Sequence, residues 1–215
     1  MRLVDLSHRI HDGLVTYPGL PPPAIGEHLS RAASRAHYAP GTEFHIARVS
    51  MVGNTGTYLD APFHRFDGAE DVGQLPLERV AALPGVVIAA TGRAIGPEAV
   101  SGCDVRGRAV LFRTGWDRHF GTAAYGTGHP FLTRGAAEAL RDRGAVLVGV
   151  DSLNVDDTAD GSRPAHTILL REGILVVEHL TNLAALPSSG FQLFAVPPPL
   201  RGVGSFPVRA FAIVP

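Results

Sequence analysis

Short apolar runs, separated by glycine and proline, dominate the pattern of hydrophobic and polar positions along this chain. Six runs have strand length and are rich in β-branched residues, and we predict strands over residues 85–90, 109–112, 145–150, 174–177, 191–196 and 208–214. Several are apolar at nearly every position, which is typical of strands that are covered on both faces. Residues 44–51 alternate in part and predict an edge or half-exposed strand.

Helical patterns are few. The clearest covers residues 133–143, where Thr133 is suited to cap the N-terminus, alanines and Leu140 favour the helix, and Gly144 is placed to end it. Short helices are expected near residues 77–83 and 97–101. Because strands outnumber helices, we predict a single α/β domain over residues 1–215, with a mixed central sheet and few helices, rather than a regular βαβ alternation.

Composition narrows the class of protein. A chain of 215 residues with 45% hydrophobic residues is long and apolar enough to bury a core. The formal net charge of −1, with no basic block, argues against nucleic acid or an anionic membrane as a partner. No apolar run approaches the roughly 20 residues that a membrane span needs, and no signal peptide is visible. The single cysteine, Cys103, fits a reducing compartment, so we expect a cytoplasmic protein.

Candidate chemistry gathers in residues 54–64, which read N-T-G-T-Y-L-D-A-P-F-H. In an extended segment, alternate side chains project to one face. That face would carry Asn54, Tyr58, Asp60 and His64, so that a carboxylate and an imidazole lie beside an amide and a phenol. Taken alone, Asp60 or His64 is better explained by a polar edge strand whose side chains face water or cap loops.

The segment resembles the signature H-x-G-T-H-x-D-x-P-x-H of the cyclase family, which includes kynurenine formamidase and isatin hydrolase. Five signature positions match, namely Gly56, Thr57, Asp60, Pro62 and His64, whereas Asn54 and Tyr58 stand in place of the two leading histidines. Further elements similar to the family's follow in order along nearly the whole chain: Asp5-Leu6-Ser7, Tyr17-Pro18-Gly19, Arg113-Thr114-Gly115-Trp116, Gly149-Val150-Asp151-Ser152, His166 to Leu170, Glu178, and Phe206 to Ala210. The resemblance implies a swivelling β/β/α fold and a homodimer or higher homo-oligomer.

The resemblance also implies a metal site. In similar enzymes the equivalent of Asp60 bridges two metals; the leading histidines complete the first site, and the equivalents of His166 and Glu178 complete the second. Asn54 offers only a neutral amide oxygen, and the phenol of Tyr58, with a reference pKa of about 10, is a poor ligand at neutral pH. Asp60, His166 and Glu178 still make three protein ligands, so we predict one divalent ion, Zn or Mn, with an open position for water.

Two further roles complete the hypothesis. His64 is the expected proton shuttle, since imidazole titrates near neutrality, and Tyr58 is a candidate hydrogen-bond donor to the substrate's carbonyl oxygen. The predicted function is a metal-dependent hydrolase acting on a small amide, lactam or lactone, with arylformamidase-like cleavage of a C–N bond. Two alternatives stay open: a catalytically silent relative that binds a small molecule, and a metal-free enzyme with His64 and Asp60 as an acid–base pair. The metal content of protein purified without chelators discriminates between them.

Four other side chains have weaker claims to this chemistry. His45 precedes the motif and is either a replacement ligand or a surface histidine. Arg65 and Arg113 are candidates to hold a substrate carboxylate, although a surface salt bridge is the better explanation for either one taken alone. His179 follows Glu178 and is expected to point to the opposite side if that segment is extended.

Overall fold

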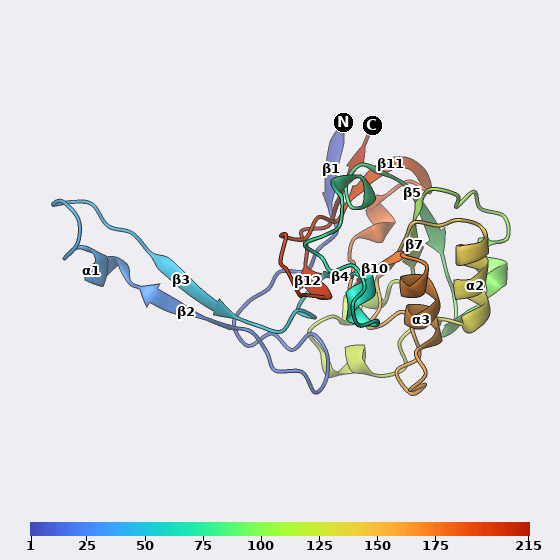
Figure 1. Cartoon of the computed structure of the whole chain (residues 1–215), viewed down its shortest axis with the longest axis horizontal. Helices are drawn as coiled ribbons and strands as arrows, with labels where there is room; N and C mark the ends of the chain where they lie inside the picture. Colours follow the sequence, from blue (N-terminus) through green and yellow to red (C-terminus); the bar gives the residue numbers. More distant parts are fainter.

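The computed structural model describes all 215 residues, and a nine-stranded mixed sheet forms its centre (Figure 1). In sheet order the strands are β1 (Arg2–Asp5), β13 (Phe211–Val214), β11 (Ser189–Phe194), β5 (Leu83–Ala89), β7 (Ala109–Arg113), β9 (Leu147–Val150), β10 (Leu175–Glu178), β4 (Tyr58–Asp60) and β12 (Ser205–Pro207). The four strands from β5 to β10 run parallel to one another, and antiparallel pairs flank them on both sides. The predicted mixed α/β fold is therefore confirmed.

The six predicted main strands are all present, with ends shifted by a few residues. The short strands β1, β4 and β12 were not predicted, because three or four residues are too few to establish a period of two. The partly alternating run at residues 44–51 does form a strand, β3 (Ile46–Ser50), but it lies outside the main sheet and is exposed along its whole length.

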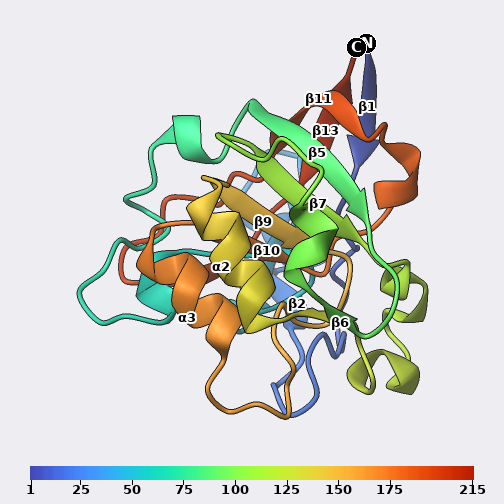
Figure 2. The ribbon, with the colours of Figure 1, turned by 90° about the vertical axis from the view of Figure 1, so that its right-hand side faces the viewer.

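Two helices cover one face of the sheet, α2 (Arg134–Asp142) and α3 (Pro164–Arg171), as Figure 2 shows. The predicted helix is α2, and its cap is as expected, since the Thr133 side chain accepts a hydrogen bond from Ala136 N. Leu140 of α2 and Leu169 of α3 pack with Val110 and Phe112 of β7 in a buried cluster. Helix α3 was not predicted, and short 3-10 turns occupy Leu77–Arg79 and Pro97–Val100.

Side chains of the opposite face form a second cluster. Leu111 and Leu147 of the central strands pack there with Leu59 of β4, Leu193 of β11 and Val4 of β1. Strands from both ends of the sheet contribute to this cluster, so the sheet curls over its own inner face. Burial on both faces explains why the central strands read as continuous apolar runs.

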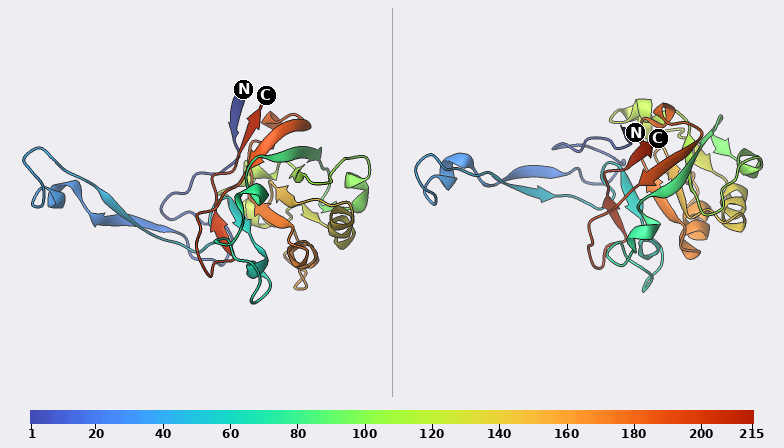
Figure 3. Two further views of the ribbon diagram at one scale, coloured as in Figure 1. Left: turned by 45° about the horizontal axis from the view of Figure 1, so that its top comes forward. Right: turned by 90° about the horizontal axis from the view of Figure 1, so that it is seen from above.

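A long arm projects from this body (Figure 3). Its two strands, β2 (Ala24–Leu29) and β3, pair only with each other, and the short helix α1 (Arg31–Ser34) lies at the tip. A separate two-stranded pair, β6 (Ala94–Ile95) and β8 (Phe131–Leu132), lies near α2. None of the helices reaches the length and apolarity that a membrane crossing requires.

Candidate metal and catalytic site

Strand pairing brings the central part of the motif against two distant segments. Strand β4 lies between β10 and β12, with Glu178 directly opposite Tyr58 and Ser205 directly opposite Asp60. Only residues 58–60 are extended, because Gly56 adopts a positive φ of 66° and residues 62–64 form a 3-10 turn. The prediction of one extended face from Asn54 to His64 is thus wrong, although Tyr58 and Asp60 do share a face.

Asp60 is completely buried, and its two carboxylate oxygens have different surroundings. Oδ1 accepts a hydrogen bond from the Ser205 hydroxyl, whereas Oδ2 has no hydrogen-bond partner. The imidazole of His166 lies close to Oδ2, with Nε2 3.6 Å away. An unpartnered buried carboxylate oxygen is costly, and it indicates a place where a cation binds.

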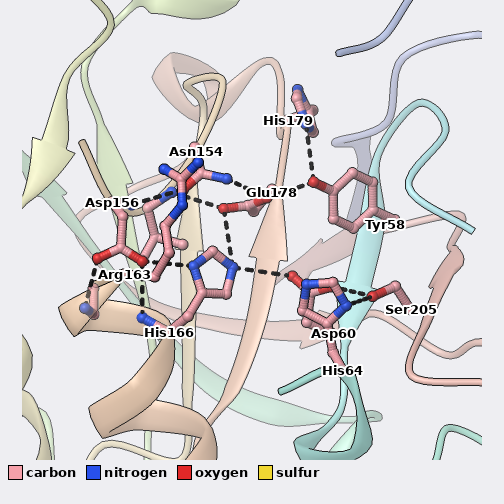
Figure 4. A network of polar contacts seen from close by, with 12 residues as sticks. Tyr58, Asp60, His64, Asn154, Asp156, Arg163, His166, Glu178, His179 and Ser205 are labelled. Atoms are coloured by element: carbon pink, nitrogen blue, oxygen red, sulfur yellow. Dashed lines mark hydrogen bonds and ion pairs between the residues drawn. The ribbon is translucent and has the colours of Figure 1, made fainter. Parts of the chain in front are cut away.

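His166 lies in the first turns of α3 and is held by the carboxylate of Asp156. This buried carboxylate accepts hydrogen bonds from His166 Nδ1 at 2.7 Å and from the amides of Ala165 and His166 at 2.6 and 3.1 Å. The same carboxylate therefore caps the helix and fixes the imidazole ring (Figure 4). With Nδ1 bound to Asp156, Nε2 faces Asp60 Oδ2 and Glu178 Oε1, each 3.6 Å away.

Glu178, at the end of β10, is held by three donors. Oε2 accepts from the Tyr58 hydroxyl at 2.5 Å and from Asn154 Nδ2 at 3.4 Å, and Oε1 accepts from Val155 N at 2.7 Å. Burial raises the pKa of Glu178 to about 7, although the charge of His166 opposes the rise. Burial also raises the pKa of Tyr58 well above its ordinary value, as do the charges of Glu178 and Asp60.

The charges around His166 favour a cation at this point. Burial by itself lowers the pKa of His166, but the carboxylates of Glu178, Asp156 and Asp60 outweigh it and raise that pKa well above its ordinary value. Burial likewise raises the pKa of Asp60, but His64 and His166 outweigh it and hold that pKa below its ordinary value. Without an ion, the protein keeps a positive charge on His166 between two carboxylates.

The spacing of these groups fits a divalent ion. Ligand bonds of about 2.1 Å at a tetrahedral angle place two ligand atoms about 3.4 Å apart, close to the observed 3.6 Å contacts of His166 Nε2. Asp60, His64 and His166 each offer a ligand atom, and these three atoms lie within 4.8 Å of one another. Glu178 contacts this group through His166 but does not belong to the compact set, so His64 competes with it for the place of third ligand.

His64 takes part in a second hydrogen-bond chain. Its Nδ1 lies 2.7 Å from the Ser205 hydroxyl, which in turn donates its proton to Asp60 Oδ1. Because that hydroxyl has one proton to give, Nδ1 of His64 must be the donor to Ser205. This assigns the proton of a neutral His64 to Nδ1 and leaves Nε2 without a hydrogen-bond partner, free to accept a proton.

Known proteins resemble this chain in sequence and in fold. The family model described as "Putative cyclase" matches residues 4–157. This chain belongs to the cyclase family. A kynurenine formamidase from Paracidovorax citrulli is 30% identical over 99% of this chain and 97% of its own length, and one from Geobacillus thermodenitrificans is 26% identical over 96% and 95%. Among solved structures, isatin hydrolase A from Labrenzia aggregata superposes with a TM-score of 0.82 at 26% identity, covering 99% of this chain and 93% of that one.

Asn54 and Tyr58 occupy the two positions at which the resemblance leads one to expect histidines. Both residues line the same pocket as His64 and His166. Tyr58 is almost fully buried, and its single proton is already donated to Glu178. To donate to a substrate carbonyl instead, the Tyr58 hydroxyl would have to turn away from Glu178.

The pocket measures about 440 Å³, a size suited to a small molecule. Its wall is built from the N-terminal loop, the motif and the segment leading into α3: Tyr17, Pro18, Gly19, Leu20, Asn54, Tyr58, His64, Arg65, Asn154, Arg163, His166 and Glu178. Arg65 thus lies at the pocket, where its Nε donates to the Thr167 hydroxyl at 3.3 Å, whereas Arg113 is not part of the wall. His45 directly precedes β3 in the arm, where its Nε2 lies 3.3 Å from Glu27 Oε1, so it is not a replacement ligand.

Four contributors to the site were not predicted from the sequence, namely Asn154, Asp156, Ser205 and His179. The prediction that His179 points away from the side of Glu178 is wrong, because its backbone leaves the extended region with a φ of +56°. Such a conformation costs a non-glycine residue about 1–3 kcal/mol. It turns the imidazole towards Tyr58, so that Nε2 lies 3.4 Å from the Tyr58 hydroxyl. No sequence signal marks this turn, since histidine carries no preference comparable to that of glycine.

Proposed function

We propose that this cyclase family member is a metal-dependent hydrolase of small amides, lactams or lactones, with an arylformamidase-like cleavage of a C–N bond. The observation that carries the proposal is the buried, unpartnered Oδ2 of Asp60 facing His166 Nε2. The relatives named kynurenine formamidase and isatin hydrolase support the reaction class. The pocket beside this pair of atoms supports a small-molecule substrate.

We propose one divalent ion, Zn or Mn, held by Asp60 and His166 with Glu178 as the third ligand. Carboxylate and imidazole suit both metals. Such an ion would lower the pKa of a water molecule towards neutrality and polarise the carbonyl that is attacked. The neutral amide of Asn54 and the engaged hydroxyl of Tyr58 offer no comparable set for a second ion.

The residues of the chain have separate tasks in this proposal. His64 accepts a proton from water through the free Nε2 and returns it to the leaving nitrogen, while Ser205 and Asp60 hold its ring by the bond at Nδ1. Asp156 keeps Nε2 of His166 directed at the carboxylates. Tyr58 bonds Glu178 in the substrate-free protein, and contact with the substrate's carbonyl oxygen remains its second proposed role.

One alternative has specific support. The chain from His64 through Ser205 to Asp60 is complete without any ion, so a metal-free acid–base enzyme remains a second candidate. A silent small-molecule binder is the third outcome of the same test.

The test combines metal analysis with turnover. Protein purified without chelators should contain about one equivalent of Zn or Mn, and Asp60→Asn should lose it, whereas the matched change Asp67→Asn at an exposed site should not. Hydrolysis of N-formylkynurenine and isatin is then followed chromatographically before and after metal removal. We expect poor turnover of N-formylkynurenine, since the first metal site lacks its histidines. Turnover that survives metal removal but not His64→Ala would favour the metal-free enzyme; neither metal nor turnover would favour the silent binder.

We also propose that the protein is a homodimer joined by the arm. The arm exposes apolar side chains and has no core of its own: Ile25, Tyr38, Phe44, Ile46 and Val49. An isolated two-stranded hairpin is at best marginally stable in water, so a covering surface from a second copy explains its shape. Light scattering should give twice the mass of the chain, and Phe44→Glu with Val49→Glu should halve it, whereas Leu77→Glu on the body should not.

The reducing, cytoplasmic location expected from the single Cys103 belongs to this proposal as well.

A further inference from the structure

A chain of four buried polar side chains runs from the candidate site into the protein interior. It links Glu178 of β10, Tyr58 of β4, His179 directly after β10, and Tyr125 in the 3-10 turn Ala123–Gly126. Their exposed fractions are only 1%, 2%, 0% and 3%. Figure 4 shows the end of this chain nearest the site, where the Tyr58 hydroxyl lies between Glu178 and His179.

The distances and the chemistry of the groups fix the direction of each hydrogen bond. The Tyr58 hydroxyl donates to Glu178 Oε2 at 2.5 Å, so its oxygen accepts from His179 Nε2 at 3.4 Å. His179 contacts no carboxylate, so a charged ring there would be buried without a counter-ion, and the ring is neutral. Since Nε2 carries the proton, Nδ1 accepts from the Tyr125 hydroxyl at 2.9 Å.

The backbone around His179 is built to place this ring. Its positive φ brings the side chains of two consecutive residues, Glu178 and His179, to the same hydroxyl. The Thr57 hydroxyl donates to the carbonyl oxygen of His179 at 2.6 Å and holds the turn, while accepting from His8 N at 3.0 Å. Apolar side chains would fill this space without burying the polar groups of Tyr58, His179 and Tyr125. Packing alone therefore does not explain why these hydrogen-bonded side chains are present.

We propose that Tyr125 and His179 are positioning residues, which orient the Tyr58 hydroxyl so that it holds the Glu178 carboxylate against His166. We call these four hydrogen-bonded side chains the relay. In it, the neutral donor Tyr58 stands where the family signature has a histidine, and contacts with His179 and Tyr125 in the interior set the direction of its hydroxyl. The inference rests on the proposed function only in taking Glu178 as part of the reaction centre. The relay itself is independent of turnover.

The consequence is a specific change of tautomer. Tyr125→Phe removes one hydroxyl and keeps the ring, so Nδ1 of His179 loses its donor. The proton of His179 is then free to move to Nδ1, and Nε2 becomes an acceptor that competes with Glu178 for the Tyr58 proton. Glu178 loses its shortest hydrogen bond, and we expect metal affinity and kcat to fall roughly 10-fold with KM unchanged.

The experiment reads the tautomer directly. Protein labelled with ¹⁵N-histidine is studied by two-bond ¹H–¹⁵N correlation in the metal-free state, and the His179 signals are assigned by their loss in His179→Gln. The parent should show a protonated Nε2, and Tyr125→Phe should show protonated Nδ1. Zn and Mn affinity are measured by chelator competition on the same samples. Tyr38→Phe, the same change on the exposed arm, is the matched control and should alter neither readout.

Each outcome decides the proposal. An unchanged His179 tautomer in Tyr125→Phe would overturn the relay, and a changed tautomer with parental metal affinity would overturn the positioning role. If the variant does not fold, Tyr58→Phe serves in its place, and parental metal affinity there would also reject the inference. A parent protein that binds no metal would reject the proposed function and the positioning role that rests on it, while the tautomer measurement would still test the relay itself.

Discussion

Replacing Asp156 with asparagine tests how the protein holds His166 ready for a metal. The carboxylate accepts three hydrogen bonds, from Ala165 N, His166 N and His166 Nδ1. An asparagine of nearly the same volume keeps one acceptor oxygen, so the bond to Ala165 N survives. The amide nitrogen then faces the two donors of His166, and at least one of these contacts must break.

Two consequences follow with different magnitudes. Hydrogen bonds to a charged group contribute about 1.5–3 kcal/mol each, and at least one of the two bonds from His166 is lost, so unfolding free energy should fall by about 2–3 kcal/mol. In a domain of this size that lowers Tm by about 5–10 °C. Metal binding needs a neutral His166 that keeps its proton on Nδ1, and the amide nitrogen introduced by Asp156→Asn disfavours that position of the proton, so metal affinity should fall roughly 10–100-fold.

The assay separates the two effects. Zn affinity is measured by competition with a chromogenic chelator, and Tm of the metal-free protein by calorimetry. Asp142→Asn, the same chemical change at an exposed site on α2, should leave both values near those of the parent. If Asp156→Asn lowers Tm but keeps Zn affinity within twofold of the parent, the carboxylate only caps α3, and the orientation argument is refuted.

Three further outcomes are expected. The double change Asn54→His, Tyr58→His should raise metal content by about one equivalent, and unchanged stoichiometry would mean that other residues exclude the first ion. His64→Ala should lower turnover roughly 10²–10⁴-fold at constant metal content; loss of metal would make His64 a ligand instead. Burial lowers the pKa of His8 to about 4, below its unfolded value near 6.5, so its contribution to stability is complete above pH 6.5 and is lost as pH falls towards 4. The parent protein should therefore lose unfolding free energy between pH 6.5 and 5, as measured by urea denaturation. His8→Phe should lose about 1–2 kcal/mol less over the same range. Identical losses in both proteins would contradict this.

Local patterns along the sequence determined much of the fold. The central strands were predictable because they are buried on both faces, and α2 because its cap, alanines and terminal glycine agree. The family signature singled out Asp60 and His64, and the later match singled out His166 and Glu178. These signals can be recognised in the sequence because each depends on only a few neighbouring residues.

Only the tertiary structure decided how those residues are used. Ser205 reaches Asp60 across 145 positions, and Tyr58 reaches Glu178 across 120, through a strand register that no local pattern records. The turn at His179 depends on one backbone angle that the Thr57 hydroxyl holds from outside the segment. The residue types determine which chemistry is available to this protein. The direction of each hydrogen bond and the choice of its partner depend on contacts between distant segments, and these contacts exist only once the chain has folded.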